Sequence, residues 1–222
     1  MTLSQHPQLA RGAHRFALIA AILGWSALAI QLYLILFARW VDQASLLAGV
    51  VRFFSFFTVT TNTLVATVLT CAIAAKDSCP HRFFRTPWVS SGIAASIVLV
   101  SIAYNVLLRP LWQPHGVQRV ADELLHDILP VLFLLYWWLY VPKGTLRIKH
   151  VLLWVIYPLA YFAYALLRGY LISDYMYPFI DVSSLGYPQT FVNALGVLVG
   201  FLLISAVLLL VDRLKGRTHT HL

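Results

Sequence analysis

Charged residues are scarce in this chain of 222 amino acids, and acidic residues are the scarcest of them. Only 11% of the residues are Asp, Glu, Lys or Arg, whereas 60% are hydrophobic and the mean hydropathy is +0.79. A soluble globular protein carries roughly 25% charged residues. The composition therefore excludes an ordinary soluble domain and indicates a protein that crosses a membrane several times.

Cysteine is also rare, and the common catalytic motifs are missing. The two cysteines, Cys71 and Cys79, cannot form a disulfide framework, and neither lies in a cluster with histidine that resembles a metal site. The chain has no G-x-S-x-G, no H-E-x-x-H and no P-loop. We therefore expect no redox chemistry, no metal and no cofactor.

The excess of basic residues does not indicate nucleic acid. Sixteen Lys and Arg against eight Asp and Glu give a formal net charge of +8, but the basic residues stand in small groups between apolar runs. Basic residues that set the topology of membrane proteins are distributed in this way. We expect membrane lipids as partners and no nucleic acid.

Apolar runs long enough to cross a bilayer occur six times. A helix of about 20 residues crosses the hydrocarbon core, and no small-residue cleavage site closes the first run, so we interpret it as a retained helix. The sequence predicts a single all-α domain over residues 1–222. It is a bundle of six transmembrane helices at about 16–38, 53–75, 88–108, 124–140, 150–171 and 189–211.

The basic residues predict the orientation of such a bundle. With the N-terminus inside, the inner segments hold eleven Lys and Arg and the outer segments hold five. Cytoplasmic loops carry the excess, so we expect a multi-pass protein of the bacterial inner membrane with both termini in the cytoplasm. The inner residues are Arg11, Arg15, Lys76, Arg82, Arg85, Lys143, Arg147, Lys149, Arg213, Lys215 and Arg217, and the outer ones are Arg39, Arg52, Arg109, Arg119 and Arg168.

Polar side chains gather in the second apolar run, where residues 52–62 have the sequence RFFSFFTVTTN. Ser55, Thr58 and Asn62 are spaced at i, i+3 and i+7, so in a helix they share one face and can line a pocket together. Ser, Thr and Asn also hold neighbouring helices together in membranes. For any one of these residues, that structural role is an equally good interpretation.

The predicted topology brings other polar residues to the same depth in the outer leaflet, among them His126 near the start of the fourth run. Ionisable groups at membrane depth are functional hypotheses by default. A hydroxyl nucleophile needs a base, and histidine has a suitable pKa. The further candidate pocket residues are Tyr104, Arg109, Asp127, Tyr164, Arg168 and Asn193.

His126 has acidic neighbours at helical spacings. Asp122 and Glu123 precede it by four and three positions, so one of these carboxylates can orient the ring, whereas Asp127 points about 100° away round the helix and suits another partner such as Arg109. The competing interpretation is an interfacial histidine without a chemical role. If one pocket forms, Ser55 or Thr58 should lie within a hydrogen bond or a bridging water of His126.

The fifth run carries a polar stripe. Tyr157, Tyr161, Tyr164 and Arg168 fall at i, i+4, i+7 and i+11, on one side of a helix. Such a stripe is typical of an aromatic belt at the membrane interface, and an arginine there can extend its head group to water.

Three segments resemble the androgen-induced-gene family of six-helix membrane proteins and its bacterial relatives. They are FFSFFTVTTN at 53–62, LLHDILPVLFLL at 124–135 and YMYPFIDV at 175–182. The resemblance extends over about 16–211. Characterised animal members hydrolyse esters of fatty acids with hydroxy fatty acids, using a threonine nucleophile and a histidine on different helices.

The resemblance implies that His126 is the base and that Ser55 or Thr58 is the nucleophile. The aromatic pattern before the hydroxyl fits both, and the residue type favours Thr58. The expected function is an intramembrane lipid ester hydrolase acting on a fatty acyl ester. The alternatives are a lipid-binding or small-solute transport protein that uses the same pocket without bond cleavage, and a scaffold. Transport ranks lower because the chain shows no internal repeat.

The predicted orientation can be tested with reporter fusions to the C-terminal tail. We expect activity from a reporter that works in the cytoplasm and none from one that works in the periplasm, because the basic excess lies on the side of the tail. A periplasmic signal from this fusion would reverse the topology.

Overall fold

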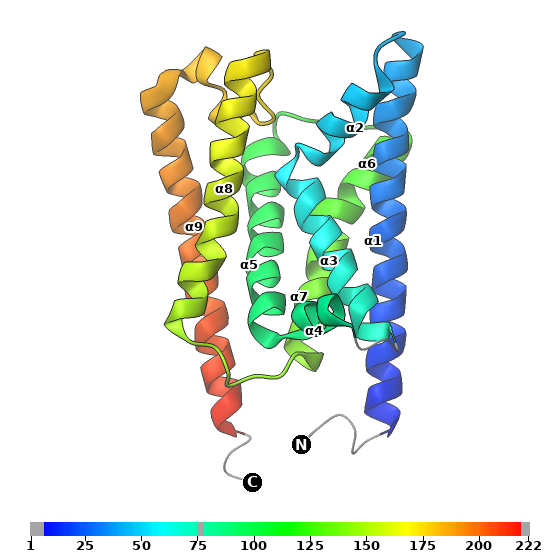
Figure 1. Ribbon diagram of the computed structural model, residues 1–222, viewed down its shortest axis with the longest axis vertical. Helices are drawn as coiled ribbons and strands as arrows, with labels where there is room; N and C mark the ends of the chain where they lie inside the picture. The colour runs from blue at the N-terminus through cyan, green and yellow to red at the C-terminus, as the bar shows by residue number, and fades with distance from the viewer. Residues whose placement is uncertain (1–6, 75–77, 219–222) are drawn as a thin grey trace.

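The structure is a computed structural model that describes residues 7–74 and 78–218, and every regular element in these ranges is a helix (Figure 1). The all-α prediction is thereby confirmed. The predicted end of the second span at residue 75 and the basic Lys76 lie outside the described residues. In chain order the α-helices are α1 (Pro7–Val41), α2 (Leu46–Phe54), α3 (Phe57–Ile73), α4 (Cys79–Arg85), α5 (Pro87–Ala103), α6 (Gly116–Glu123), α7 (Leu129–Tyr140), α8 (Ile148–Ile172) and α9 (Val182–Thr218); η2 (Tyr104–Leu108) and η3 (Leu124–Ile128) are π-helical, and η4 (Pro178–Ile180) is a 3₁₀ turn.

Four helical segments of the described chain are long and apolar enough to cross a membrane: Arg11–Val41, Pro87–Leu108, Ile148–Ile172 and Val182–Arg217. α2 and α3 make a fifth if they are counted as one span, although a bend of 74° separates them. The predicted fourth span, 124–140, is not among them; this part of the chain forms η3 and the 12-residue α7. The structure thus has four to five candidate spans where the sequence predicted six.

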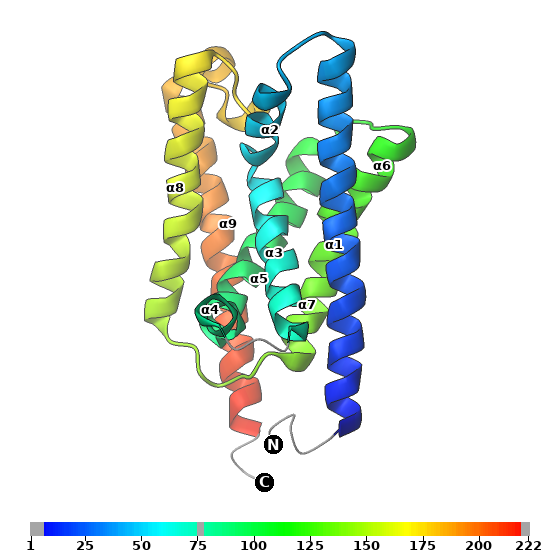
Figure 2. The ribbon, with the colours of Figure 1, turned by 45° about the vertical axis from the view of Figure 1, so that its right-hand side comes forward.

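The long helices run side by side, and the first described residues of the chain lie at the same end of the bundle as the last. α1 begins and α9 ends there, and α4 and the connection from α7 to α8 lie at the same end (Figures 1 and 2). Of the eleven basic residues that the sequence assigned to the inner side, the structure describes ten: nine belong to these segments, and the tenth, Lys149, is the second residue of α8. The charge asymmetry of the sequence is therefore an asymmetry between the two ends of the bundle.

The connection from α7 to α8 is held against the end of α9. The Leu146 amide donates a hydrogen bond of 2.9 Å to the buried Asp212 carboxylate, and the Lys143 ammonium lies 4.2 Å from the centre of the Trp137 ring. Burial, together with the nearby Lys215, lowers the pKa of Lys143 to about 8. Since the unfolded chain binds more protons between that pH and the model value of 10.5, the cost of burying this lysine falls and the folded state gains stability as the pH rises through this range.

α5 occupies the middle of the bundle, where it contacts α3, α7, α8 and α9. Its first half is rich in small buried residues, which let neighbouring helices approach closely. Gly92 faces the Trp154 indole, and the tryptophans next to α5 have hydrogen-bond partners on it. Trp137 donates to the Ser91 hydroxyl at 2.8 Å, and Trp154 donates to the Trp88 carbonyl at 2.9 Å.

We expect Gly92→Ala to destabilise the bundle. The added Cβ would lie 2.5 Å from Cδ1 of the buried Trp154 ring, and overpacking of this kind costs about 1–3 kcal/mol. Thermal unfolding in detergent should show a melting temperature several degrees lower. Gly12→Ala is the matched control, because nothing lies within 4 Å of its added Cβ. Equal melting temperatures for the two variants would contradict the close packing of α5 on α8.

Candidate functional site

The polar stretch 52–62 is broken in the middle. α2 ends at Phe54, Ser55 and Phe56 leave the helix, and α3 begins at Phe57 in a direction that differs by 74°. The prediction that Ser55 shares one helical face with Thr58 and Asn62 is therefore wrong, because Ser55 caps α2 while the other two lie in α3. All three residues are nevertheless buried.

Side-chain hydroxyls satisfy the backbone groups that the break releases. The Ser55 hydroxyl donates to the Val51 carbonyl at 2.7 Å, and the Tyr161 hydroxyl donates to the Ser55 carbonyl at 2.9 Å. The Thr58 amide, in the first turn of α3, donates to the Tyr177 hydroxyl at 3.3 Å. A helix end buried without such partners is costly, so these hydroxyls stabilise the break.

The tyrosine stripe of α8 faces this stretch instead of forming an interfacial belt along its whole length. The Tyr157 hydroxyl lies 2.8 Å from the Thr60 hydroxyl and 2.9 Å from the Thr61 hydroxyl. The Tyr164 hydroxyl lies 2.7 Å from the Ser55 hydroxyl. The tyrosine hydroxyls of the stripe therefore pair with the hydroxyls of α3 and of Ser55, the residue that caps α2.

Arg168 continues the stripe into an ion pair. Its guanidinium donates to the Asp174 carboxylate at 3.1 Å, and Arg52 from α2 forms an ion pair with the same carboxylate. One acidic side chain thus ties α8 to α2 above the break.

An apolar cavity of about 370 Å³ begins next to the break, between α3, α5, η2, α8, η4 and α9. Four lining side chains carry hydroxyls, namely Thr58, Tyr104, Tyr161 and Tyr177, and none is charged. The Thr58 hydroxyl lies 3.3 Å from that of Tyr177. The other lining residues are Phe57, Leu99, Val100, Ala103, Leu108, Pro158, Leu159, Phe162, Phe179, Ile180, Phe191, Ala194, Leu195, Val197, Leu198 and Phe201.

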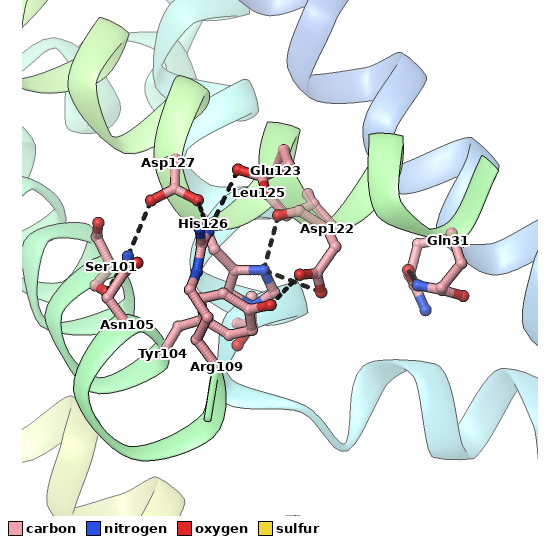
Figure 3. A network of polar contacts seen from close by, with 12 residues as sticks. Gln31, Ser101, Tyr104, Asn105, Arg109, Asp122, Glu123, Leu125, His126 and Asp127 are labelled. Carbon is pink, nitrogen blue, oxygen red and sulfur yellow. Dashed lines mark hydrogen bonds and ion pairs between the residues drawn. The ribbon is translucent and has the colours of Figure 1, made fainter. Parts of the chain in front are cut away.

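His126 lies in η3 and has its own polar neighbours (Figure 3). Its ring stacks on Tyr104 with the centroids 3.8 Å apart, and Tyr104 donates a hydrogen bond to the Asp122 carboxylate. Nδ1 of His126 lies 2.8 Å from the Asp122 carbonyl oxygen and 3.5 Å from its carboxylate. Of the two acids at helical spacing, Asp122 is the one that contacts the ring, and it does so most closely through its backbone carbonyl and not through the predicted carboxylate.

The contact between His126 and the Asp122 carbonyl fixes the proton on the ring. A carbonyl oxygen only accepts hydrogen bonds, so Nδ1 carries a hydrogen. In the neutral ring Nε2 then has a free lone pair, which is the arrangement that a general base needs.

Arg109 gathers the remaining acids of this segment (Figure 3). It forms ion pairs with Asp127 and, at 3.2 Å, with Glu123, and Asn105 donates to Asp127 at 2.8 Å. The partnership of Asp127 with Arg109 that the sequence suggested is present. The Arg109 guanidinium carbon also lies 5.2 Å from the centre of the Tyr104 ring, the ring on which His126 stacks.

α3, which carries Thr58, contacts η3, which carries His126. Among the residues that the structure describes, neither Ser55 nor Thr58 hydrogen-bonds to His126. Asn62 connects the two groups, because its amide nitrogen donates to the Thr58 carbonyl at 2.8 Å and to the Leu125 carbonyl at 3.1 Å.

Asn193 lies apart from this group, on α9. It donates to the Phe179 carbonyl at 2.9 Å and accepts from Gln189 at 2.9 Å. Within residues 7–74 and 78–218, no group of three or more His, Cys, Asp or Glu is placed to hold a metal ion.

The structure adds two residues to the candidate site that the sequence indicates. Tyr161 and Tyr177 were not chosen as site residues, although both hydroxyls serve the break and both rings line the cavity. The Tyr-Pro-Phe segment carried the only signal for Tyr177.

Comparison with known proteins leaves the family open: no family model, no curated protein and no solved structure matches the chain. The roles of the candidate residues therefore depend on the geometry alone.

We expect Tyr177→Phe to destabilise the protein, because it leaves the buried Thr58 amide without its acceptor. An unsatisfied buried donor costs about 1–3 kcal/mol. The measurement is thermal unfolding in detergent, with Tyr170→Phe as control, since Tyr170 is 72% exposed and a surface change should stay within about 0.5 kcal/mol. An unchanged stability of the Tyr177 variant would show that the hydroxyl does not support the break.

Proposed function

We propose that this chain is a six-span membrane protein that hydrolyses acyl esters of lipids, with the acyl chain in the apolar cavity and the ester at Thr58. The supporting observation is the cavity itself. Its wall is apolar and carries no charged residue, and its polar groups are hydroxyls, among them that of Thr58. A pocket of this kind suits a hydrocarbon chain with one polar group.

The sixth span of this proposal is the segment from α6 to α7. Its helical elements follow one another without a gap from Gly116 to Tyr140, and they run along the bundle beside α1 and α3 (Figure 2). The four long helical segments, the α2–α3 pair and this segment make six crossings. The number has to be even, because α1 begins and α9 ends at the same end of the bundle. We further propose that this basic end faces the cytoplasm of a bacterial inner membrane.

The proposed reaction has two steps. The Thr58 oxygen attacks the ester carbonyl while His126 accepts the hydroxyl proton, and the alcohol leaves with that proton, so that an acyl-threonine remains. Water then attacks the acyl-threonine, releases the fatty acid and returns the hydrogen to Thr58. This assignment requires Nε2 of His126 to approach Thr58 when substrate is bound, and catalytic contacts are often longer before binding.

Ser55 is the second candidate for the nucleophile, and its surroundings favour it less. Its side chain is fully buried, it already donates to the Val51 carbonyl, and it does not line the cavity. Within the described residues the Thr58 hydroxyl has one partner, the Tyr177 hydroxyl, and Thr58 lines the cavity. Both remain in the test because the sequence admits both.

Lipid binding without hydrolysis is the alternative function. The observation that favours it is the separation of His126 from both hydroxyls, since His126 and Thr58 each have other partners. A binder needs the cavity and none of the proton transfer.

Hydrolysis of a panel of fatty acyl esters separates the two functions. For a hydrolase, we expect His126→Ala and Thr58→Ala each to lower turnover by about 10²- to 10⁴-fold while lipid binding persists. The double variant should lose little more, because residues of one catalytic unit fail together. Ser55→Ala should retain activity if Thr58 is the nucleophile.

The control for these variants is Thr67→Ala. Thr67 also lies on α3, and its hydroxyl donates to the Thr63 carbonyl at 2.8 Å, away from the cavity wall. Equal activity of all variants and wild type would remove this site from the mechanism. Binding without turnover of any ester by the wild type would establish the binder.

A further inference from the structure

A groove on the surface of the bundle continues the wall of the cavity. It lies between α5 with η2 on one side and α9 on the other, and its volume is about 440 Å³. Leu99, Ala103, Phe179 and Val197 line both the groove and the cavity. The two hollows are therefore separated by the thickness of single side chains.

Two glycines keep this groove open. Gly196 and Gly200 lie four residues apart on α9, so they share one face of the helix. A Cβ added at either position would meet nothing within 4 Å. In membrane helices this spacing usually lets two helices touch, but within the described residues no helix fills the space. Glycine in a helix costs about 1 kcal/mol relative to alanine, so the open space is obtained at a cost in stability.

The rim of the groove is apolar and exposed. Val106 is 65% exposed, Val192 61% and Ile102 48%. Such a surface on a helix that spans a membrane faces the hydrocarbon of the bilayer and not water. The opening therefore lies where lipid chains are.

The polar side chain in the groove, that of Asn193, already has hydrogen-bond partners within the protein. Asn193 uses its amide nitrogen on the Phe179 carbonyl and its oxygen on Gln189. The guest therefore gains only from apolar contact, as a hydrocarbon chain does.

We infer that the groove is a lateral entrance, through which the acyl chain of a membrane lipid passes between α5 and α9 into the cavity. The inference rests on the proposed function only for the identity of the guest in the cavity. The shared wall favours a lipid chain over a helix of a second copy, since a helix seated on the glycines would close the way to the cavity.

The experiment uses the full chain in phosphatidylcholine nanodiscs that contain phosphatidylcholine with a photoactivatable diazirine in its acyl chain. Leucine at both glycines (Gly196→Leu with Gly200→Leu) fills the groove and removes no contact. Gly12→Leu is the matched control, because it too lies in a helix with open space. Labelled peptides are mapped in each protein, and thermal unfolding shows that each is folded.

In the wild type and in the control, we expect label on the cavity wall, for example at Phe201, and on the groove. In the double leucine variant, labelling of the cavity should fall about tenfold. A change of one methylene in an apolar pocket alters the discrimination between ligands by at least about this factor. Hydrolysis of long-chain lipid esters should fall with it, while a short, water-soluble ester should still be cleaved.

Equal labelling of the cavity in the double leucine variant would overturn the inference. So would a wild-type dimer that disappears in this variant, because a second copy would then occupy the groove. If no protein hydrolyses any ester but the labelling pattern holds, the proposed hydrolase fails and the entrance stands. If hydrolysis is intact and independent of chain length in the leucine variant, the entrance fails and the hydrolase stands.

Discussion

The structure depends on the satisfaction of backbone groups at a helix break buried in an apolar bundle. At Ser55 and Phe56 the chain turns by 74°, and carbonyl and amide groups lose their helical partners where little water reaches them. Each unpaired group would cost several kcal/mol in such surroundings. Tyr161 and Tyr177 supply the missing partners from α8 and from the segment before η4. The break therefore fixes how α8 and the segment before α9 sit on α3.

The same requirement shapes the cavity. Tyr161 and Tyr177 turn their hydroxyls to the break and leave their rings on the cavity wall, so the wall is aromatic and three of its four hydroxyls, including that of Thr58, lie next to the break. Most hydroxyls of the polar stretch serve the structure, as those of Thr60 and Thr61 do through Tyr157. Thr58 differs from them because its hydroxyl lines the cavity as well. The structural interpretation thus fits Thr60 and Thr61, and the proposed chemical role falls on Thr58.

The sequence predicted what local physics decides and missed what tertiary contacts decide. Helical class and the long helices at 16–38, 88–108 and 150–171 follow from hydropathy, and each lies within an observed helix or a pair of continuous helical elements. The break at Ser55 has no glycine or proline to mark it, so a straight helix was predicted. The partners of Tyr157 and Tyr164 lie about a hundred positions away, and spacing along one helix cannot name them. The contact between His126 and Asp122 could be predicted because the two residues are four positions apart in one helical segment.

Asn62 is the residue in which these constraints meet. Its amide nitrogen donates to backbone carbonyls of α3 and η3, so it holds the segment with the proposed nucleophile against the one with the proposed base. Its own carbonyl oxygen is buried and has no donor among the described residues. Such an atom is costly to keep, and native proteins retain few of them. Asn62 is fully buried and does not line the cavity, so the unpaired oxygen is the cost of the link that its amide nitrogen makes between α3 and η3.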